Sequence, residues 1–331
     1  MLNGKCLVIG ASGFLGGHTT KQLVAQGNDV RILVRESADT IATDHLQNIE
    51  RLYGSCFDPE TLRAALQGVS YVFYCVVDAR SFLRDTAPLW KTNVENLKVV
   101  LEEVVQHPLE KFIFTSTLAT IGINPSGVAT EADLLTDWED APEYTQTRLE
   151  AERLVLRYCN EHGLPGVAMC VSNTYGIEDY QPTPHGKIIW NAATGAMPVY
   201  FPGGIESVDV VDAAKAMVLA AAKGRCGQRY IISEKYLTIK QTIALGAQAG
   251  GRKAPRLGVP LPLFWLICAT IEFVSLILPV DKHLGFSSWK MLTKMPRMDC
   301  SKARRELGWQ PRPVEEAIAD AVASYKKILK K

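Results

Sequence analysis

The sequence has no block of like charge, no internal repeat and no low-complexity segment. Its 36 basic and 35 acidic residues nearly cancel, and balanced charge argues against nucleic acid as a partner. The 8 cysteines never form a C-x-x-C pair, so neither a metal site nor a disulfide framework is expected. The N-terminus lacks the cationic start of a signal peptide. These absences together favour a cytoplasmic protein.

A long uninterrupted hydrophobic run is also missing. The most apolar stretch, 259–280, contains Glu272, and Pro262 and Pro279 shorten its uninterrupted run. A helix that spans a bilayer needs about 20 consecutive apolar residues, so this stretch is not expected to cross one. We interpret it as a buried helix or, alternatively, as a helix that contacts a membrane surface between the flanking Lys253, Arg256 and Lys282.

The N-terminal region contains a glycine-rich turn between an expected strand, 5–9, and an expected helix, 14–26. A strand, a glycine turn and a helix in this order predict a dinucleotide-binding unit. The first glycine permits the tight turn, the second lets a pyrophosphate approach, and the third lets the helix pack closely on the strand. The N–H groups at the helix start hold the phosphate charge. The predicted cofactor-binding residues of this turn are Gly10, Ser12, Gly13, Phe14, Leu15 and Gly16.

Arg35 follows a second expected strand, 29–34, and bears on the identity of the cofactor. An acidic side chain at this point binds the ribose 2′-hydroxyl of NAD, whereas an arginine suits the 2′-phosphate of NADP. The alternative is a solvated arginine at a strand end, which the adjacent Glu36 favours. We therefore expect NADP(H) to be preferred over NAD(H).

Strand-like and helix-like segments alternate along the first half of the chain. Further strands are expected at 49–53, 69–77, 111–115 and 167–171, and long helices at 88–106 and 142–162. This alternation predicts an α/β fold, a Rossmann-like doubly wound parallel sheet covered on both faces. We assign residues 1–172 to a dinucleotide-binding domain, to which 205–233 returns. A smaller, mainly helical substrate-binding domain is assigned to 173–204 and 234–331.

Two groups of residues are candidates for chemistry. Three hydroxyls, Thr115-Ser116-Thr117, end an expected strand, and Tyr144 and Arg148 share one face of an expected helix. A neighbouring cation stabilises a phenolate, and such a tyrosine can pass a proton to a carbonyl oxygen. A hydroxyl from the neighbouring strand can hold the same oxygen. The alternative is an ordinary contact between neighbours on an exposed helix.

These motifs together resemble the extended short-chain dehydrogenase/reductase family, of the NAD-dependent epimerase/dehydratase type. The resemblance includes Asn93 and the Leu307-Gly308-Trp309 ending, covers essentially the whole chain, and is strongest to dihydroflavonol reductases and 3β-hydroxysteroid dehydrogenases. It implies that Tyr144 is the general acid/base, that Thr117 takes the family's Ser/Thr position, and that Asn93 steadies the sheet and a proton path.

The chain departs from the family pattern in several places. Arg148 replaces the lysine of Tyr-x-x-x-Lys, and an arginine can bind a nicotinamide ribose but cannot lose its proton. Ser55 stands where the family often has an aspartate that contacts the adenine amine, and Tyr74-Cys75-Val76 replaces a His-x-Ala. The resemblance places Ser55, Cys56, Cys75, Tyr144 and Arg148 beside the cofactor. It also implies a homodimer that forms through the two long helices.

The leading hypothesis is an NADPH-dependent reductase, working reversibly, of a hydrophobic ketone, aldehyde or steroid-like carbonyl. The apolar stretch 259–280 suits a lipophilic small-molecule substrate better than a nucleotide sugar. Because the family lysine is missing, a redox-silent NADP-binding sensor or scaffold is a second hypothesis. Oxidation of a 3β-hydroxysteroid is a third, since residues do not fix the direction of the reaction.

Overall fold

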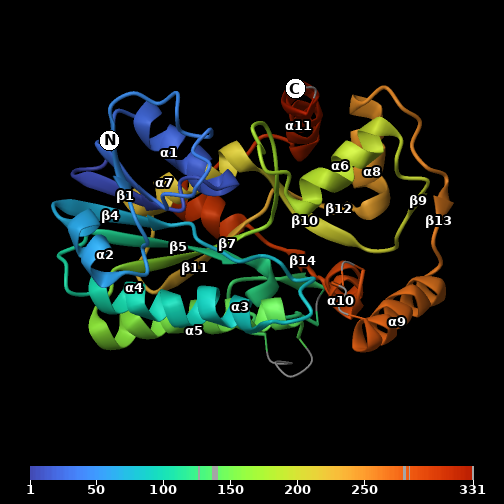
Figure 1. Cartoon of the computed structure of the whole chain (residues 1–331), viewed down its shortest axis with the longest axis horizontal. Helices are drawn as coiled ribbons and strands as arrows, with labels where there is room; N and C mark the ends of the chain where they lie inside the picture. The colour runs from blue at the N-terminus through green and yellow to red at the C-terminus, as the bar shows by residue number, and fades with distance from the viewer. Residues whose placement is uncertain (126, 136–140, 279–280, 283, 330–331) are drawn as a thin grey trace.

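The structure, a computed structural model, describes residues 1–125, 127–135, 141–278, 281–282 and 284–329. Its centre is a sheet of seven parallel strands in the order β11-β7-β5-β4-β1-β2-β3 (Figure 1). The strands are β1 (Lys5–Ile9), β2 (Val30–Val34), β3 (Ile49–Tyr53), β4 (Val69–Tyr74), β5 (Lys111–Thr117), β7 (Gly166–Val171) and β11 (Gln228–Ile232). The predicted Rossmann-like sheet is thereby confirmed.

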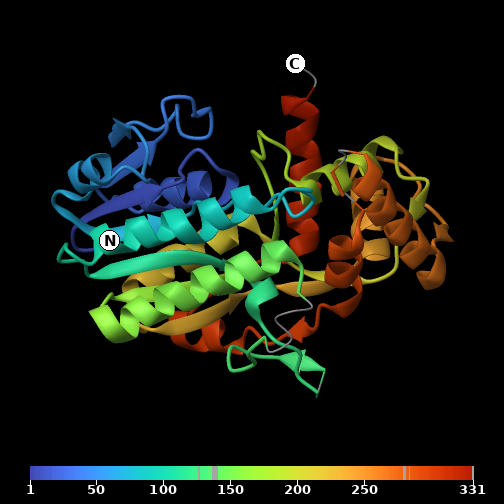
Figure 2. The ribbon, with the colours of Figure 1, turned by 60° about the horizontal axis from the view of Figure 1, so that its bottom comes forward.

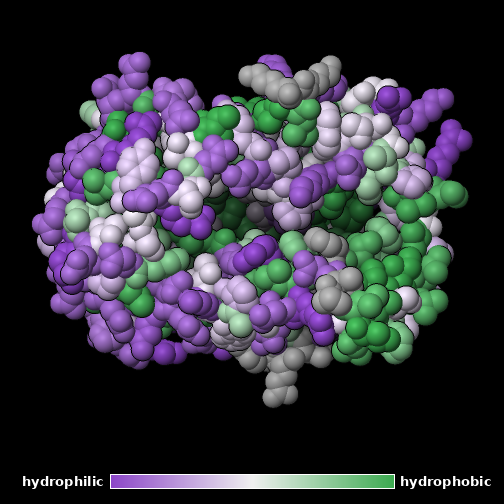
Figure 3. Space-filling model, in the orientation of Figure 1, coloured by the Kyte–Doolittle hydropathy of each residue, from purple (hydrophilic) through white to green (hydrophobic). Residues whose placement is uncertain are grey.

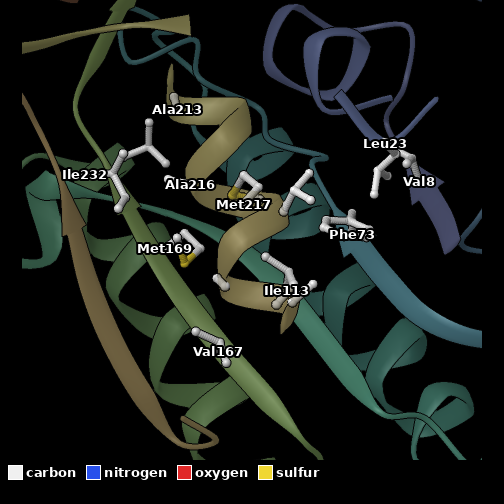
Figure 4. Packing of buried hydrophobic residues seen from close by; sticks show 14 of the residues in the cluster. Val8, Leu23, Phe73, Ile113, Val167, Met169, Ala213, Ala216, Met217 and Ile232 are labelled. Carbon is white, nitrogen blue, oxygen red and sulfur yellow. The ribbon is translucent and has the colours of Figure 1, made fainter. Parts of the chain in front are cut away.

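Helices cover both faces of this sheet. One face carries α1 (Phe14–Ala25) and α7 (Val210–Lys223), and the other carries α2 (Pro59–Leu66), α4 (Asn96–Val104) and α5 (Glu143–His162). Figure 4 shows the first layer, where side chains of the sheet strands, among them Ile113, Met169 and Ile232, lie beside Ala213, Ala216 and Met217 of α7. A sheet buried on both faces needs nearly continuous apolar strands, which explains why β2, β4 and β7 were readable from sequence.

The strand order reverses between β1 and β4, which creates the crevice where dinucleotides bind in such sheets. Gly10 ends β1 with φ +91°, a conformation that strains residues with a side chain. A Cβ on Gly10 would lie 2.9 Å from the backbone of Cys75, which follows β4. The Cys75 N–H in turn donates to the Ile9 carbonyl at 2.8 Å. The glycine turn is therefore held at the carboxyl ends of the two central strands.

A smaller region follows β7 and lies beside the carboxyl ends of the sheet strands (Figures 1 and 2). Its three-stranded sheet has the order β12-β10-β8, and β8 continues almost directly from β7. Two pairs of short strands, β9 with β13 and β6 with β14, add to it. The strands are β6 (Val128–Ala129), β8 (Asn173–Tyr175), β9 (Val199–Tyr200), β10 (Gly204–Asp209), β12 (Lys235–Thr238), β13 (Leu257–Gly258) and β14 (Arg297–Met298). The helices are α6 (Pro184–Thr194), α8 (Ile239–Ala249), α9 (Leu261–Ile277), α10 (Phe286–Lys294) and α11 (Val314–Ile328).

The predicted division into two domains stays a prediction, and the structure adds two observations to it. β11 pairs with β7 in the main sheet, whereas β10, also within 205–233, pairs with β8 and β12. Close to the C-terminus, Ala303, Leu307 and Trp309 are buried in the core of the main sheet. The chain therefore crosses between the two regions more often than sequence reasoning assumed.

The predicted long helix 88–106 is confirmed, with one irregularity inside it. α3 (Ala87–Trp90), a π-type turn (Lys91–Glu95) and α4 follow one another without a break. In this turn the N–H of Asn96 donates to the carbonyl of Lys91, one residue further back than in an α-helix. The pattern of apolar residues is similar in both conformations, so periodicity did not reveal the wide turn.

The interpretation of 259–280 as a buried helix is wrong. α9 forms within it, but Leu266, Phe273, Leu276 and Ile277 are mostly exposed, with Leu276 at 74%. Pro279 and Val280 lie outside the described residues. Within the described part of the chain, no helix has the length and hydrophobicity required to traverse a bilayer.

Candidate active site

The glycine turn and the start of α1 form an open site for an anion. A Cβ on Gly16 would lie 2.1 Å from the Gly10 carbonyl oxygen, so a larger residue cannot stand there. The Gly13 N–H closes the turn by donating to Gly10 O at 3.0 Å. No side chain caps α1, and its first turn holds no acidic residue. The first N–H groups of the helix therefore face the crevice, as binding of a pyrophosphate requires.

The other residues of this turn connect α1 to the smaller region. Ser12 and Leu15 are half-buried, and the Phe14 ring meets the His18 ring edge-on at 5.5 Å. His18 Nε2 lies 3.0 Å from the carbonyl oxygen of Ile177. Burial, with a contribution from Lys21, lowers the pKa of His18 to about 4, so this histidine is neutral at physiological pH.

The predicted adenine and ribose residues lie at the ends of β2, β3 and β4. Arg35 is exposed and makes no ion pair with any described residue. Ser55 is half-buried, and its hydroxyl accepts the Phe57 N–H at 3.2 Å. Burial raises the pKa of Cys56 to about 12 and that of Cys75 to about 11, so neither thiol is a nucleophile at neutral pH.

The last two hydroxyls of β5, on Ser116 and Thr117, point to opposite faces, as alternation along a strand requires. Ser116 is buried and donates to the Glu152 carboxylate, on the α5 side of the sheet. Thr117 is half-buried, and its hydroxyl oxygen accepts the Ala119 N–H at 3.3 Å. The Thr117 O–H is therefore available to donate to a ligand, whereas the Ser116 hydroxyl is occupied.

Tyr144 and Arg148 occupy the first two turns of α5, on one face. Tyr144 is half-buried, but Arg148 is only 1% exposed. The Arg148 Nη2 donates to the Thr115 carbonyl, and its guanidinium lies 5.1 Å from the centre of the Phe114 ring. Burial lowers the pKa of Arg148, while the nearby Tyr144 favours its charged form.

Two nitrogens of Arg148, Nε and Nη1, are buried without a hydrogen-bond partner among the described residues. Buried polar atoms in native proteins are almost always satisfied, so these donors indicate a ligand group. The hydroxyls of a dinucleotide ribose have the required acceptor chemistry. Arg148 and the open start of α1 therefore fit a bound dinucleotide. Arg148 would hold its ribose, and the N–H groups at the start of α1 would hold its pyrophosphate.

Asn93 lies in the π-type turn and is 2% exposed. Its side-chain oxygen accepts the Asp78 N–H at 2.9 Å, and its amide donates to Asp78 O at 3.0 Å and to Thr147 Oγ1 at 3.1 Å. It thus fastens the loop after β4 to α5, close to Tyr144 and Arg148. This agrees with a steadying function, while its place in a proton path stays a prediction.

An apolar pocket of about 140 Å³ is lined by chain neighbours of Thr117 and Tyr144, although Thr117, Tyr144 and Arg148 are not among its lining residues. Leu118 and Ala119, which follow Thr117, form one wall, and Pro142 and Thr145, which flank Tyr144, form another. The far wall comes from α10 and the segment after it. The full lining is Leu118, Ala119, Ile121, Ile123, Leu135, Ala141, Pro142, Thr145, Lys290, Met291, Lys294, Met295 and Pro296.

Sequence reasoning missed the far wall of this pocket and a buried ion pair behind the site. Met291 and Met295 carry no motif, and only the tertiary fold brings them to the ends of β5 and α5. Arg229 and Glu152 pair at 2.9 Å although they are far apart in sequence, and both are nearly inaccessible to solvent. No local pattern indicates either feature.

The fold and the site define a Rossmann-type dinucleotide-binding protein. Comparison with known proteins identifies the group more closely: the chain belongs to the NAD dependent epimerase/dehydratase family, which matches residues 6–233. It is an NAD(P)-dependent oxidoreductase of the extended short-chain dehydrogenase/reductase type. The interpretation as a redox-silent sensor is therefore not retained.

Two relatives and one solved structure cover nearly the whole chain. Sterol demethylase protein B of Methylococcus capsulatus is 29% identical over 97% of this chain and 98% of its own length. A dihydroflavonol 4-reductase-like protein of Synechocystis is 29% identical over 95% of this chain and 92% of its own. The crystal structure of gox2253 matches with a TM-score of 0.88 at 29% identity and covers 98% of both chains.

Proposed function

We propose that the protein is an NADP(H)-dependent reductase, working reversibly, of a hydrophobic ketone, aldehyde or steroid-like carbonyl. The observation that carries this proposal is an apolar pocket lined by Leu118 and Ala119, which follow Thr117 at the end of β5, and by Thr145, which follows Tyr144. The names of the two relatives, a sterol demethylase protein and a dihydroflavonol reductase, agree with a lipophilic ring system as substrate. The residues named as cofactor-binding in the sequence analysis complete this proposed site.

The reaction adds two electrons and two hydrogens to a carbonyl group. A bound dinucleotide supplies the hydride that the carbonyl carbon receives. Tyr144 donates its phenolic proton to the carbonyl oxygen, so that C=O becomes CH–OH, and the tyrosine regains its proton from solvent. Thr117 donates a hydrogen bond to the same oxygen and holds it in place. Arg148 holds the ribose through charged hydrogen bonds.

The pocket supports a lipophilic substrate. Apart from Thr145, Lys290 and Lys294, its lining side chains are apolar. Pockets of this kind gain affinity from burial of apolar surface and offer few partners for the hydroxyls and phosphates of a nucleotide sugar. A screen of lipophilic ketones, aldehydes and 3β-hydroxysteroids, in both directions and with both cofactors, tests the proposal. If the screened compounds gave no turnover with either cofactor, the proposal would be contradicted.

The preference for NADP depends on Arg35. Replacement Arg35→Ser is expected to weaken NADP binding about 10- to 100-fold and to leave NAD binding nearly unchanged, because charge-assisted hydrogen bonds to the 2′-phosphate are lost. Titration of the purified variants with each dinucleotide measures both constants. The matched control is Arg157→Ser, which removes a half-exposed arginine from the outer face of α5. If Arg35→Ser weakened the binding of NAD and NADP equally, Arg35 would not be the residue that recognises the 2′-phosphate.

The contribution of Arg148 to dinucleotide binding can be measured separately from its effect on folding. Replacement Arg148→Met is expected to weaken dinucleotide binding about 10- to 100-fold, since charged hydrogen bonds to the ribose disappear. The melting temperature of the cofactor-free protein should stay equal or rise, because a buried cation with two unpaired nitrogens is removed. Arg148→Lys keeps the charge and should retain binding within about tenfold. Unchanged binding in Arg148→Met would contradict its proposed contact with the ribose.

A further inference from the structure

The most unusual surface of the molecule is α9. Figure 3 shows hydrophobic residues gathered over this helix, at the end of the molecule opposite the N-terminal strands. Leu263, Leu266, Thr270, Phe273 and Ile277 follow one another at spacings of three and four residues, so they share one face, and all five are exposed. Single exposed apolar residues are common on proteins, but a contiguous apolar helix face indicates an interaction surface.

Two polar residues of α9, Glu272 and Ser275, are directed toward the protein. Ser275 is buried and donates to the Glu272 carbonyl, while the Glu272 carboxylate pairs with Lys282 at 2.7 Å and accepts the Phe286 N–H at 3.0 Å. Thr270, the polar member of the exposed stripe, donates its hydroxyl to the Leu266 carbonyl at 2.8 Å. The outward face is therefore more apolar than the inward face, the reverse of an ordinary surface helix.

The helix is attached to the rest of the molecule through aromatic contacts. Phe264, fully buried, meets Phe201 at 4.8 Å between ring centres, and Trp265 meets Phe286 of α10 at 5.9 Å. These contacts use one side of α9 and leave the stripe uncovered in the single chain. The fold therefore turns this face of α9 outward.

Basic residues concentrate around this face. Residues 252–297 contain seven Lys or Arg and two carboxylates, although the whole chain has a net charge of only +1. Arg252, Lys253 and Arg256 precede α9, are exposed, and pair with no carboxylate among the described residues. The two carboxylates of the segment are engaged, since Asp281 accepts the Arg84 N–H and Glu272 pairs with Lys282.

We propose that α9 lies in the surface of an anionic lipid membrane, with the stripe from Leu263 to Ile277 inserted among the acyl chains and the neighbouring cations against lipid phosphates. An apolar helix face bounded by lysine and arginine is the pattern that binds such surfaces. A second copy of the chain fits less well, because a two-fold contact would place these cations against the same cations. The helix lies on the membrane and does not cross it.

The test is sedimentation of the full chain with lipid vesicles, which needs no enzyme activity. The protein is expected to bind vesicles of phosphatidylcholine with phosphatidylglycerol, and to bind pure phosphatidylcholine more weakly. Leu266→Ser/Phe273→Ser should weaken binding about tenfold or more through lost apolar burial. Lys253→Glu/Arg256→Glu should weaken binding to the anionic vesicles. High salt should weaken the binding of the parent protein to the same vesicles. Unaltered dinucleotide binding by the variants shows that they fold.

Matched controls carry the same changes elsewhere on the surface. Ile41→Ser/Leu329→Ser removes two exposed apolar side chains, and Lys98→Glu/Lys327→Glu reverses two exposed charges. Both controls should bind vesicles like the parent. Absence of vesicle binding by the parent, or equal binding by the α9 variant, overturns the proposal. A parent dimer that dissociates on Leu266→Ser/Phe273→Ser, without vesicle binding, would assign the face to a second copy and also overturns it.

Discussion

Replacement of Tyr144 by phenylalanine is expected to lower kcat by about 10²- to 10⁴-fold, the usual contribution of a positioned general acid. The change removes one hydroxyl group and keeps the ring that packs at the start of α5. Dinucleotide affinity should remain within about threefold, because Tyr144 serves the reacting carbonyl more than the cofactor. The expected signature is a loss of kcat with intact cofactor binding.

Steady-state kinetics with the best carbonyl from the screen, together with dinucleotide titration, measures both quantities. Tyr158→Phe is the matched control, since Tyr158 lies further along α5 and faces the core. Wild-type turnover in Tyr144→Phe would show that another group donates the proton. A similar loss of kcat in Tyr158→Phe would instead indicate that turnover is sensitive to any change in α5.

Replacement of Arg229 by methionine is expected to cause the largest loss of stability, about 3–5 kcal/mol, which corresponds to about 4–7 °C in melting temperature. Arg229 and Glu152 form a buried ion pair at 2.9 Å, with side chains 7% and 2% exposed. Glu152 also accepts hydrogen bonds from Ser116, from Thr120 at 3.0 Å and from Cys170 at 3.3 Å. Without Arg229 this carboxylate is left as a buried, uncompensated charge.

The double variant Arg229→Met/Glu152→Gln separates the cost of the unpaired Glu152 charge from the cost of losing the other hydrogen bonds of Arg229. Removal of both charges should restore most of the lost melting temperature, since the net value of a buried ion pair is small compared with the cost of breaking it. Differential scanning calorimetry of the single and double variants measures the effect. A double variant no more stable than Arg229→Met would show that hydrogen bonds of Arg229, such as that to the Thr120 carbonyl at 3.0 Å, dominate.

The sequence predicted the features that depend on local pattern. Five strands of the main sheet are apolar runs between turn residues, and the glycine turn is fixed by sterics within a few residues, as the 2.1 Å approach at Gly16 shows. The start of α2 is likewise set by local contacts, because the Asp58 side chain accepts the Thr61 N–H, as an N-cap does. Such features need no knowledge of distant contacts.

The remaining features depend on contacts between distant segments. Hydrophobicity marked 259–280 but did not indicate which side of α9 the protein covers, since almost every position is apolar. Met291 and Met295 follow β5 by some 170 residues in the sequence, and only the folded chain brings them to the pocket at its end. Asn93 was predicted as a functional residue, but its partners, Asp78 and Thr147, became visible only in the structure.

The π-type turn at Lys91–Glu95 has a consequence for insertions and deletions in this chain. Such a turn holds one residue more than an α-helical turn, so α3 and α4 are offset by about 100° from the phase of a continuous helix. Leu89, Asn93 and Leu97 nevertheless are all buried. Deletion of one residue here would restore regular α-helical hydrogen bonding and rotate Asn93 away from Asp78 and Thr147. The length of this turn, and not only its residue types, therefore keeps the loop after β4 fastened to α5.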